Sequence, residues 1–349
     1  MGILPWYATR EDFRRALDFN ESSRSIVAID RALEHGSREV ERLCHRSFLP
    51  VKATRYFRYP DSSRATSSWR LWLEEDELVS LTTLTVAGEA VTDYYLEPIN
   101  TGPPYESLEV NRSTVGSFTT GATEQRNISI TGVFGYGNDT KASGALGAAI
   151  TTTAATTCQV TDSAAIGVGD AIFVDSEYLH VTEKAMLDTG QNLQTNMSAS
   201  TADTIVDVTT GSSYSVGEVL LLDAEKMLVE EIAGNNLIVR RGFEGTVVAA
   251  HTAPVDIYAP RTLTVIRGAL GTTAATHLIS ATLARHVAPG PVRSLALAEA
   301  INHFFNELSG MARTIGSGDA VRNATGTTIE KLRDQVYESY GRMGRSDAV

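Results

Sequence analysis

The stretch Asn127-Ile-Ser-Ile-Thr-Gly-Val-Phe-Gly-Tyr-Gly137 decides how the chain divides. Ile128 and Ile130 alternate with polar residues, which predicts a strand, and the glycines at the end of the stretch close it. A segment of different composition follows, and a strongly amphipathic pattern resumes only at Pro289. We therefore expect residues 138–288 to be an insertion, with residues 1–137 and 289–349 forming one core.

Composition and charge narrow the function classes. With 349 residues, 42% apolar and 21% charged, the chain has the composition of a soluble globular protein of two to three domains. No apolar run approaches the length of a membrane span, and the start lacks the pattern of a signal peptide. A net charge of -12 argues against wrapping nucleic acid, although it suits a surface past which DNA slides. Two distant cysteines exclude a disulfide framework and a thiolate zinc site.

The flanking segments predict helices and a small antiparallel sheet. A capped helix is expected from Thr9, and a second from about Ser25 to Cys44, with Gly36 as a point at which it could divide. After Val51 the chain consists of short runs rich in Val, Thr, Tyr and Trp, separated by turn residues. The expected strands lie near Thr54–Tyr59, Arg70–Leu73, Leu81–Val86, Tyr94–Glu97, Ser107–Val110 and Asn127–Thr131. With the helix that begins near Pro291, these elements predict an α+β fold: a core of helices and a small antiparallel sheet, joined to an all-β insertion.

The insertion contains an internal repeat with two different offsets. The segment Val168–Glu177 returns 48 positions later as Val216–Glu225, whereas Leu237–His251 returns 26 positions later as Leu263–His277. Unequal offsets favour nesting of one module inside another over a simple tandem copy. We therefore expect an inner module at 203–258, within an outer module split between 155–185 and 261–285. Three degenerate tandem copies are the alternative.

The repeated residues predict structure more strongly than chemistry. The carboxylates Asp175, Glu177, Asp223 and Glu225 could bind a hard cation, but two residues apart at a hairpin tip they favour solvated turn positions. The repeated arginines could hold a phosphate, yet a partner carboxylate or backbone carbonyls inside the module suit them better. For the histidines we expect hydrogen bonds to backbone. The residues that define the repeat are Arg241, Gly242, Gly245, Thr246, His251, Arg267, Gly268, Gly271, Thr272 and His277. We expect no catalytic residue, no cofactor and no metal ligand.

The last amphipathic segment is the one stretch that suggests a contact with a partner. Its apolar and aromatic residues are Ile329, Leu332, Val336, Tyr337 and Tyr340. A short helix with two tyrosines beside its aliphatic residues could dock on another protein. Packing back on its own domain is the equal alternative.

The order of these features resembles the head-to-tail connector (adaptor) family of tailed bacteriophages. The resemblance covers roughly 1–137 and 289–345, and residues 138–288 depart from the compact family pattern. It rests on Ser37-Arg-Glu-Val-Glu-Arg-Leu-Cys-His-Arg-Ser-Phe48, Leu71-Trp-Leu73, Leu78-Val-Ser-Leu81, Tyr95-Leu-Glu-Pro98, Ile128–Gly137 and the helix from Pro291. The repeated Arg-Gly-x-x-Gly-Thr modules are similar to β-repeats of other phage structural proteins.

The resemblance implies a structural, non-enzymatic protein of the virion neck, assembled in the host cytoplasm. Its partners would be further copies of itself in a ring, commonly twelvefold, the portal protein and the next neck or tail protein. Genomic DNA would pass through without specific binding, and no membrane would be involved. Two alternatives are a tail or capsid decoration protein whose repeats bind host-surface glycans, and a metal-dependent hydrolase that uses the Asp-x-Glu turns.

Overall fold

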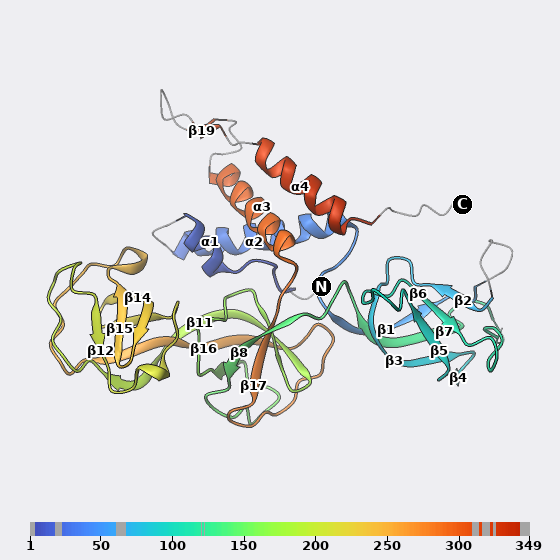
Figure 1. The fold of residues 1–349 in the computed structure, drawn as a ribbon, viewed down its shortest axis with the longest axis horizontal. Coiled ribbons are helices and arrows are strands. Elements are labelled where there is room, and N and C mark those ends of the chain that lie inside the picture. The colour runs from blue at the N-terminus through green and yellow to red at the C-terminus, as the bar shows by residue number, and fades with distance from the viewer. Residues whose placement is uncertain are drawn as a thin grey trace.

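The computed structural model describes residues 4–17, 23–60, 68–119, 121, 123–308, 314–315, 322–323 and 326–342. The fold is mostly β, with 37% of residues in strands and 21% in helices, so the predicted α+β class with a helical core is wrong. Figure 1 shows helices above a long central sheet, with smaller sheets to one side. The central core cluster contains Tyr7 of the N-terminal segment, Ala171 from the first part of the insertion and Leu270 from its last part.

The described residues contain four α-helices: α1 (Arg10–Leu17), α2 (Ser23–Cys44), α3 (Gly290–Leu308) and α4 (Gly326–Tyr340). Ile29, Leu33 and Val40 recur at helical spacing on α2 and are fully buried or nearly so. Gly36 does not divide this helix. Its missing side chain instead lets α3 approach closely. A Cβ atom placed there would lie 2.3 Å from the carbonyl oxygen of Ala296. Among the described residues, no helix is both long enough and apolar enough to cross a membrane.

Two small sheets form the N-terminal β region. A four-stranded sheet has the order β1 (Val51–Phe57), β7 (Ile128–Phe134), β3 (Leu78–Val86) and β4 (Glu89–Ala90). A three-stranded sheet has the order β2 (Arg70–Trp72), β6 (Ser107–Val110) and β5 (Tyr94–Glu97). Alternate residues of β7 are buried, as expected for a strand with one face on a core. These sheets enclose a core of their own, which includes Leu84, Leu108, Ile130 and Phe134.

The insertion forms a ten-stranded antiparallel sheet. Its path runs β12 (Ile205–Asp207), β15 (Asn236–Arg240), β14 (Glu225–Ala233), β13 (Val219–Leu222), β16 (Asp256–Ala269), β11 (Glu177–Asn192), β10 (Ala171–Val174), β17 (Thr282–His286) and β8 (Thr140–Ala145). β9 (Thr157–Gln159) pairs with β16 beside this path. β18 (Thr314–Ile315) and β19 (Arg322–Asn323) form a separate pair. Two short 3-10 turns lie at Gly211–Ser213 and Phe243–Gly245.

Within each module, strand pairing joins the front half of the repeat to the back half of the same module. Leu263 on β16 faces Lys184 on β11, whereas Ile257 on the same strand faces Leu222 on β13. The core of the inner module includes Val206, Leu220 and Ile257. A separate core in the outer module includes Ile172, Leu179 and Leu263. The long strands β11 and β16 run through both modules.

The helices pack mainly on one another, with a core of their own that includes Phe13, Ile29 and Phe304, and a second cluster joins them to the insertion. Val40 of α2 and Val292 of α3 share one core cluster with Ala171 of β10, Tyr178 of β11 and Leu270. The N-terminal sheets touch this cluster only where β1 begins and β7 ends. An amphipathic pattern identifies which helix face is buried, but it does not identify the surface that covers it.

Candidate functional site: two matching Arg, Glu and His clusters

The β13–β14 hairpin positions the first cluster. Asp223 occupies the turn with a φ of 49°, in the left-handed region that aspartate tolerates better than most residues. Glu225 follows as the first residue of β14 and points inward, with its side chain fully buried. The sequence-level expectation that both carboxylates are solvated therefore holds for Asp223, whose side chain is 60% exposed, and is wrong for Glu225.

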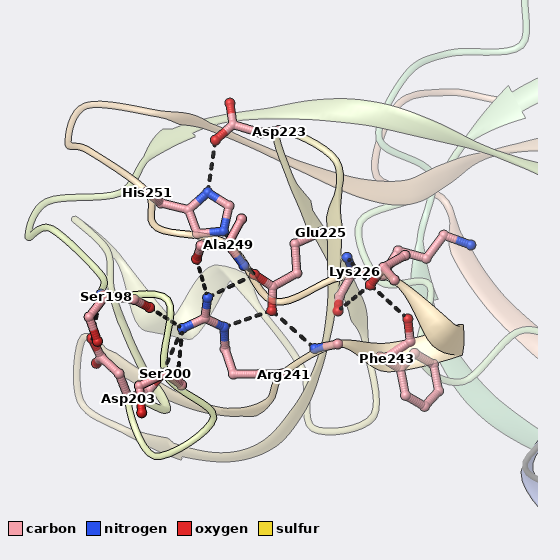
Figure 2. A network of polar contacts seen from close by, with 12 residues as sticks. Ser198, Ser200, Asp203, Asp223, Glu225, Lys226, Arg241, Phe243, Ala249 and His251 are labelled. Carbon is pink, nitrogen blue, oxygen red and sulfur yellow. Dashed lines mark hydrogen bonds and ion pairs between the residues drawn. The ribbon is translucent and has the colours of Figure 1, made fainter.

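Arg241 is the main partner of Glu225 (Figure 2). Its Nε and one terminal nitrogen donate to the two carboxylate oxygens, each at 2.7 Å. Its remaining N–H groups donate to the backbone carbonyls of Ser198, Asp203 and Ala249 at 2.6–3.1 Å. The bidentate arrangement is the strongest geometry for an arginine and carboxylate pair. Both side chains are at most 1% exposed.

Further donors complete the shell around Glu225. The backbone N–H groups of Gly242 and Ala249 donate to its oxygens, both at 3.0 Å. His251 lies between the two carboxylates, with Nε2 3.0 Å from Glu225 and Nδ1 2.8 Å from Asp223. Burial opposes the charged form of Glu225, but the hydrogen bonds from Arg241, the two N–H groups and His251 outweigh it and lower its pKa to about 2.

The glycines and threonine of the repeat shape the turn beside this cluster. Gly242 has a φ of 62° and Gly245 a φ of 74°, conformations that glycine adopts without strain. Thr246 Oγ1 accepts a hydrogen bond from the backbone N–H of Lys226 at 3.0 Å and donates to the carbonyl of Phe243 at 3.0 Å. The turn thereby holds Gly242 against Glu225.

The outer module repeats the cluster bond for bond. Arg267 donates to both oxygens of the buried Glu177 at 2.8 Å, and His277 lies 2.9 Å from Glu177 and 2.7 Å from Asp175. The backbone N–H groups of Gly268 and Ala275 donate at 2.7 and 2.9 Å. The pKa of Glu177 is again about 2, because these bonds outweigh the effect of burial. Its turn is equivalent too: Thr272 Oγ1 accepts from the N–H of Tyr178 at 2.9 Å, and Gly271 has a φ of 77°.

The two clusters stabilise the modules through contacts that are all internal. The carboxylate oxygens of Glu225 and Glu177, the guanidinium groups and both nitrogens of each imidazole face protein partners, so Glu225, Glu177 or either histidine would have to break a buried contact to act as a general base. The arginines have the carboxylate and carbonyl partners that the repeat indicates. The histidines contact carboxylates where backbone was expected. The signal for this pairing was the common recurrence of Asp-x-Glu, Arg and His in both modules.

No group of three or more His, Cys, Asp or Glu side chains that could hold a metal ion occurs among the described residues. Asp175, 58% exposed at its side chain, and Asp223 are the solvent-facing members of their clusters.

The apolar residues of α4 mostly face the interior of this chain. Val336 is fully buried, and three partly buried neighbours pack against the same core cluster: Ile329, Leu332 and Tyr340. Tyr337 differs, with 41% of its surface exposed. These contacts match the alternative in which the helix packs on its own domain, and they leave Tyr337 as the exposed member of the predicted docking set.

Comparison with known proteins gives no match to a protein family, to a curated protein or to a solved structure.

Proposed function

We propose that this chain is a structural virion protein, a head-to-tail connector that assembles into a ring between the portal and the tail or next neck protein. The observation that carries the proposal is the internal use of its most regular charged residues. Arg241, Glu225 and His251, like their counterparts in the outer module, bind one another and stabilise two β modules. Such residues support an architectural role for the chain.

Contacts between the segments that resemble connectors support the same function. Ser47 accepts a backbone hydrogen bond from Tyr136 at 2.9 Å, and the rings of Phe48 and Tyr136 lie 5.3 Å apart. A Cβ atom on Gly135 would lie 2.3 Å from the carbonyl oxygen of Leu49, so glycine permits this close contact. Two motifs separated by some eighty residues of sequence thus form one joint between α2 and β7.

Charge is consistent with the passage of DNA through such a ring. A net charge of -12 gives the assembled particle a strongly negative field, which disfavours adhesion of the phosphate backbone. A closed ring also requires a head-to-tail interface between copies, in which two different surfaces of the chain meet. No binding cleft within a single copy is needed for this function.

The test is the assembly of the purified chain. Light scattering coupled to size exclusion is expected to give a mass of many copies, and negative-stain images are expected to show rings. On intact particles, antibody labelling should fall at the neck. A single copy at the highest attainable concentration, with label on spikes or fibres of the particle, would overturn the proposal and favour the glycan-binding alternative.

A further inference from the structure

The two modules share a turn, which we call the outer turn (Val168–Gly169, before β10) and the inner turn (Val216–Gly217, before β13). The glycines have similar left-handed conformations, with φ values of 104° and 91°. Each also donates its N–H to a backbone carbonyl at a matching position, Gly169 to Val181 of β11 at 2.9 Å and Gly217 to Val229 of β14 at 2.8 Å. The two turns therefore offer the same backbone surface.

The outer turn holds the N-terminal segment of the chain. The backbone N–H of Trp6 donates to the carbonyl of Gly169 at 2.9 Å, and that of Arg10 donates to the carbonyl of Val168 at 3.1 Å. The N–H of Val168 donates in return to Glu11 at 2.8 Å. The Trp6 ring packs on Gly169, where an added Cβ would lie 2.3 Å from it. Val168 is consequently only 2% exposed.

Two carboxylates fix the cation of that segment: Asp30 on α2, whose oxygens accept from Arg10 at 2.8 and 2.6 Å, and Glu183 on β11. Arg10 donates to both oxygens of Glu183 at 2.8 and 3.1 Å. Glu183 follows a bulge in the pairing of β11 with β16, directly after Val181. The outer turn thus recognises three things: extended backbone, an aromatic ring over glycine, and an arginine four residues beyond the aromatic residue.

The inner turn presents the same features, and among the described residues no extended segment covers it. Val216 is 59% exposed, and a Cβ built on Gly217 would meet only the Cβ of Ala164 at 3.9 Å and a guanidinium nitrogen of Arg15 at 4.0 Å, a cation that could lie over the face of an aromatic ring bound there. Glu231 follows the equivalent bulge after Val229 and is exposed. Its place corresponds to that of Glu183 at the same offset of 48 that relates the front halves of the modules. Half-buried Leu228 replaces His180, whose ring lies 6.3 Å from that of Trp6 in the outer module.

We propose that the inner turn is a docking site for an extended segment of a partner protein that carries an aromatic residue and, four positions later, Arg or Lys. The aromatic ring would lie on Gly217 and Leu228, and the cation would bind Glu231. The charge is complementary, since a cationic segment meets an exposed carboxylate on a chain of net charge -12. The chain's own segment is already bound at the outer turn, so the occupant is a different protein. This inference rests on the repeat and does not depend on ring assembly.

The test uses a labelled peptide with the sequence of residues 4–17 as the probe and the full-length chain as the receptor. Fluorescence anisotropy is expected to show saturable binding of one peptide per chain. Glu231→Lys should weaken this binding at least tenfold, and so should replacing the tryptophan and first arginine of the peptide by alanine. Glu230→Lys is the matched control: this exposed neighbour pairs with Arg240 at 3.6 Å, and binding should stay unchanged. Thermal unfolding should show that both variants remain folded.

Three results would overturn the proposal. The first is the absence of saturable binding at millimolar peptide. The second is binding that Glu183→Lys changes and Glu231→Lys does not, because the peptide would then be exchanging with the bound segment at the outer turn. The third is a smaller assembly of the chain alone after Glu231→Lys, which would make a second copy the occupant.

Discussion

Arg241 and Glu225 carry opposite charges into a site that water does not reach. Either charge buried alone would be strongly unfavourable, and the pair is tolerated because backbone carbonyls and N–H groups satisfy the remaining donors and acceptors. His251 then extends the contact to Asp223 at the surface. The energetic value of each residue in the cluster therefore depends on the presence of the others.

Removal of the arginine alone should unfold the inner module more readily. Arg241→Met leaves Glu225 buried without its main partner, and we expect the free energy of unfolding to fall by about 3–5 kcal/mol. Arg240→Met is the matched control, since Arg240 is about half exposed and its contact with Glu230 is worth about 0–1 kcal/mol. Urea unfolding monitored by circular dichroism measures both. Equal effects of the two substitutions would contradict a stabilising role for the cluster.

The clusters should also set how the protein responds to acid. Glu177 and Glu225 have folded pKa values of about 2, below the ordinary 4.5, so their contribution to stability is complete above pH 4.5 and is lost as pH falls toward 2. The urea midpoint of the native chain should fall steeply in this range. Glu225→Gln should lower the midpoint at pH 7 and give a shallower fall. An identical pH profile for both proteins would show that Glu225 does not contribute in this way.

Asp170 is expected to act in the opposite direction. Burial raises its pKa to about 6, against an ordinary 3.8, so the folded state favours its protonated form. Its contribution is complete below pH 3.8 and is lost as pH rises through 6. Asp170→Asn should therefore reduce the loss of stability between pH 4 and 7, measured by the same urea titration. A steeper loss in the variant would reverse the assigned sign.

At the scale of elements, local sequence patterns predicted where each helix or strand lies in the chain better than which elements pack against it. Alternation predicted a strand near Asn127–Thr131, where β7 covers Ile128–Phe134, and helical spacing predicted α2. Gly36 was the exception. The sequence marked it as a point at which the helix could divide, whereas in the structure it permits close contact with α3. The fold class was wrong because strands outweigh helices, at 37% against 21% of residues, and the insertion forms the largest sheet. The partners of His251 were missed because the carboxylates lie 26 and 28 residues earlier in the sequence.

Helix α4 provides a test at this scale. Val336 is fully buried against the core cluster, whereas its neighbour Tyr337 is 41% exposed. Val336→Asp should detach the helix, because an unpaired carboxylate is unfavourable in that core. Limited proteolysis read by mass spectrometry should then release the C-terminal segment at least tenfold faster. Tyr337→Ser is the control and should leave the cleavage rate nearly unchanged, whereas similar rates in all three proteins would contradict the packing of α4.

At the scale of the whole molecule, two continuous strands join the modules and the helices cover one of them (Figure 1). The inner module has its own core, and residues 193–255, which carry most of it, begin and end at one place, where Asn192 and Asp256 face each other on β11 and β16. The outer module differs, because Ala171 and Tyr178 belong to the core cluster of the helices. The two modules therefore differ in how much the rest of the chain depends on them.

Removal of the inner module should leave a folded protein. Replacing residues 193–255 by an Asn-Gly turn would close β11 and β16 as a hairpin. Calorimetry should show one cooperative transition, with a Tm within about 10 °C of the native value, equivalent to roughly 6 kcal/mol for a chain of this size. Removal of residues 138–288 is the contrasting case: it uncovers Val40 and Val292 and should produce aggregates. If the smaller deletion aggregates as well, the inner module is not an independent unit.

The contact between Gly36 and Ala296 fixes the axial register of the α2 and α3 pair. A shift of α2 by one residue, about 1.5 Å along its axis with a turn of about 100°, would bring the side chain of His35 or Ser37 against a backbone that leaves no space for it. The two helices therefore have a single resting alignment. We therefore expect α2 and α3 to move as one rigid body in any rearrangement of the helices.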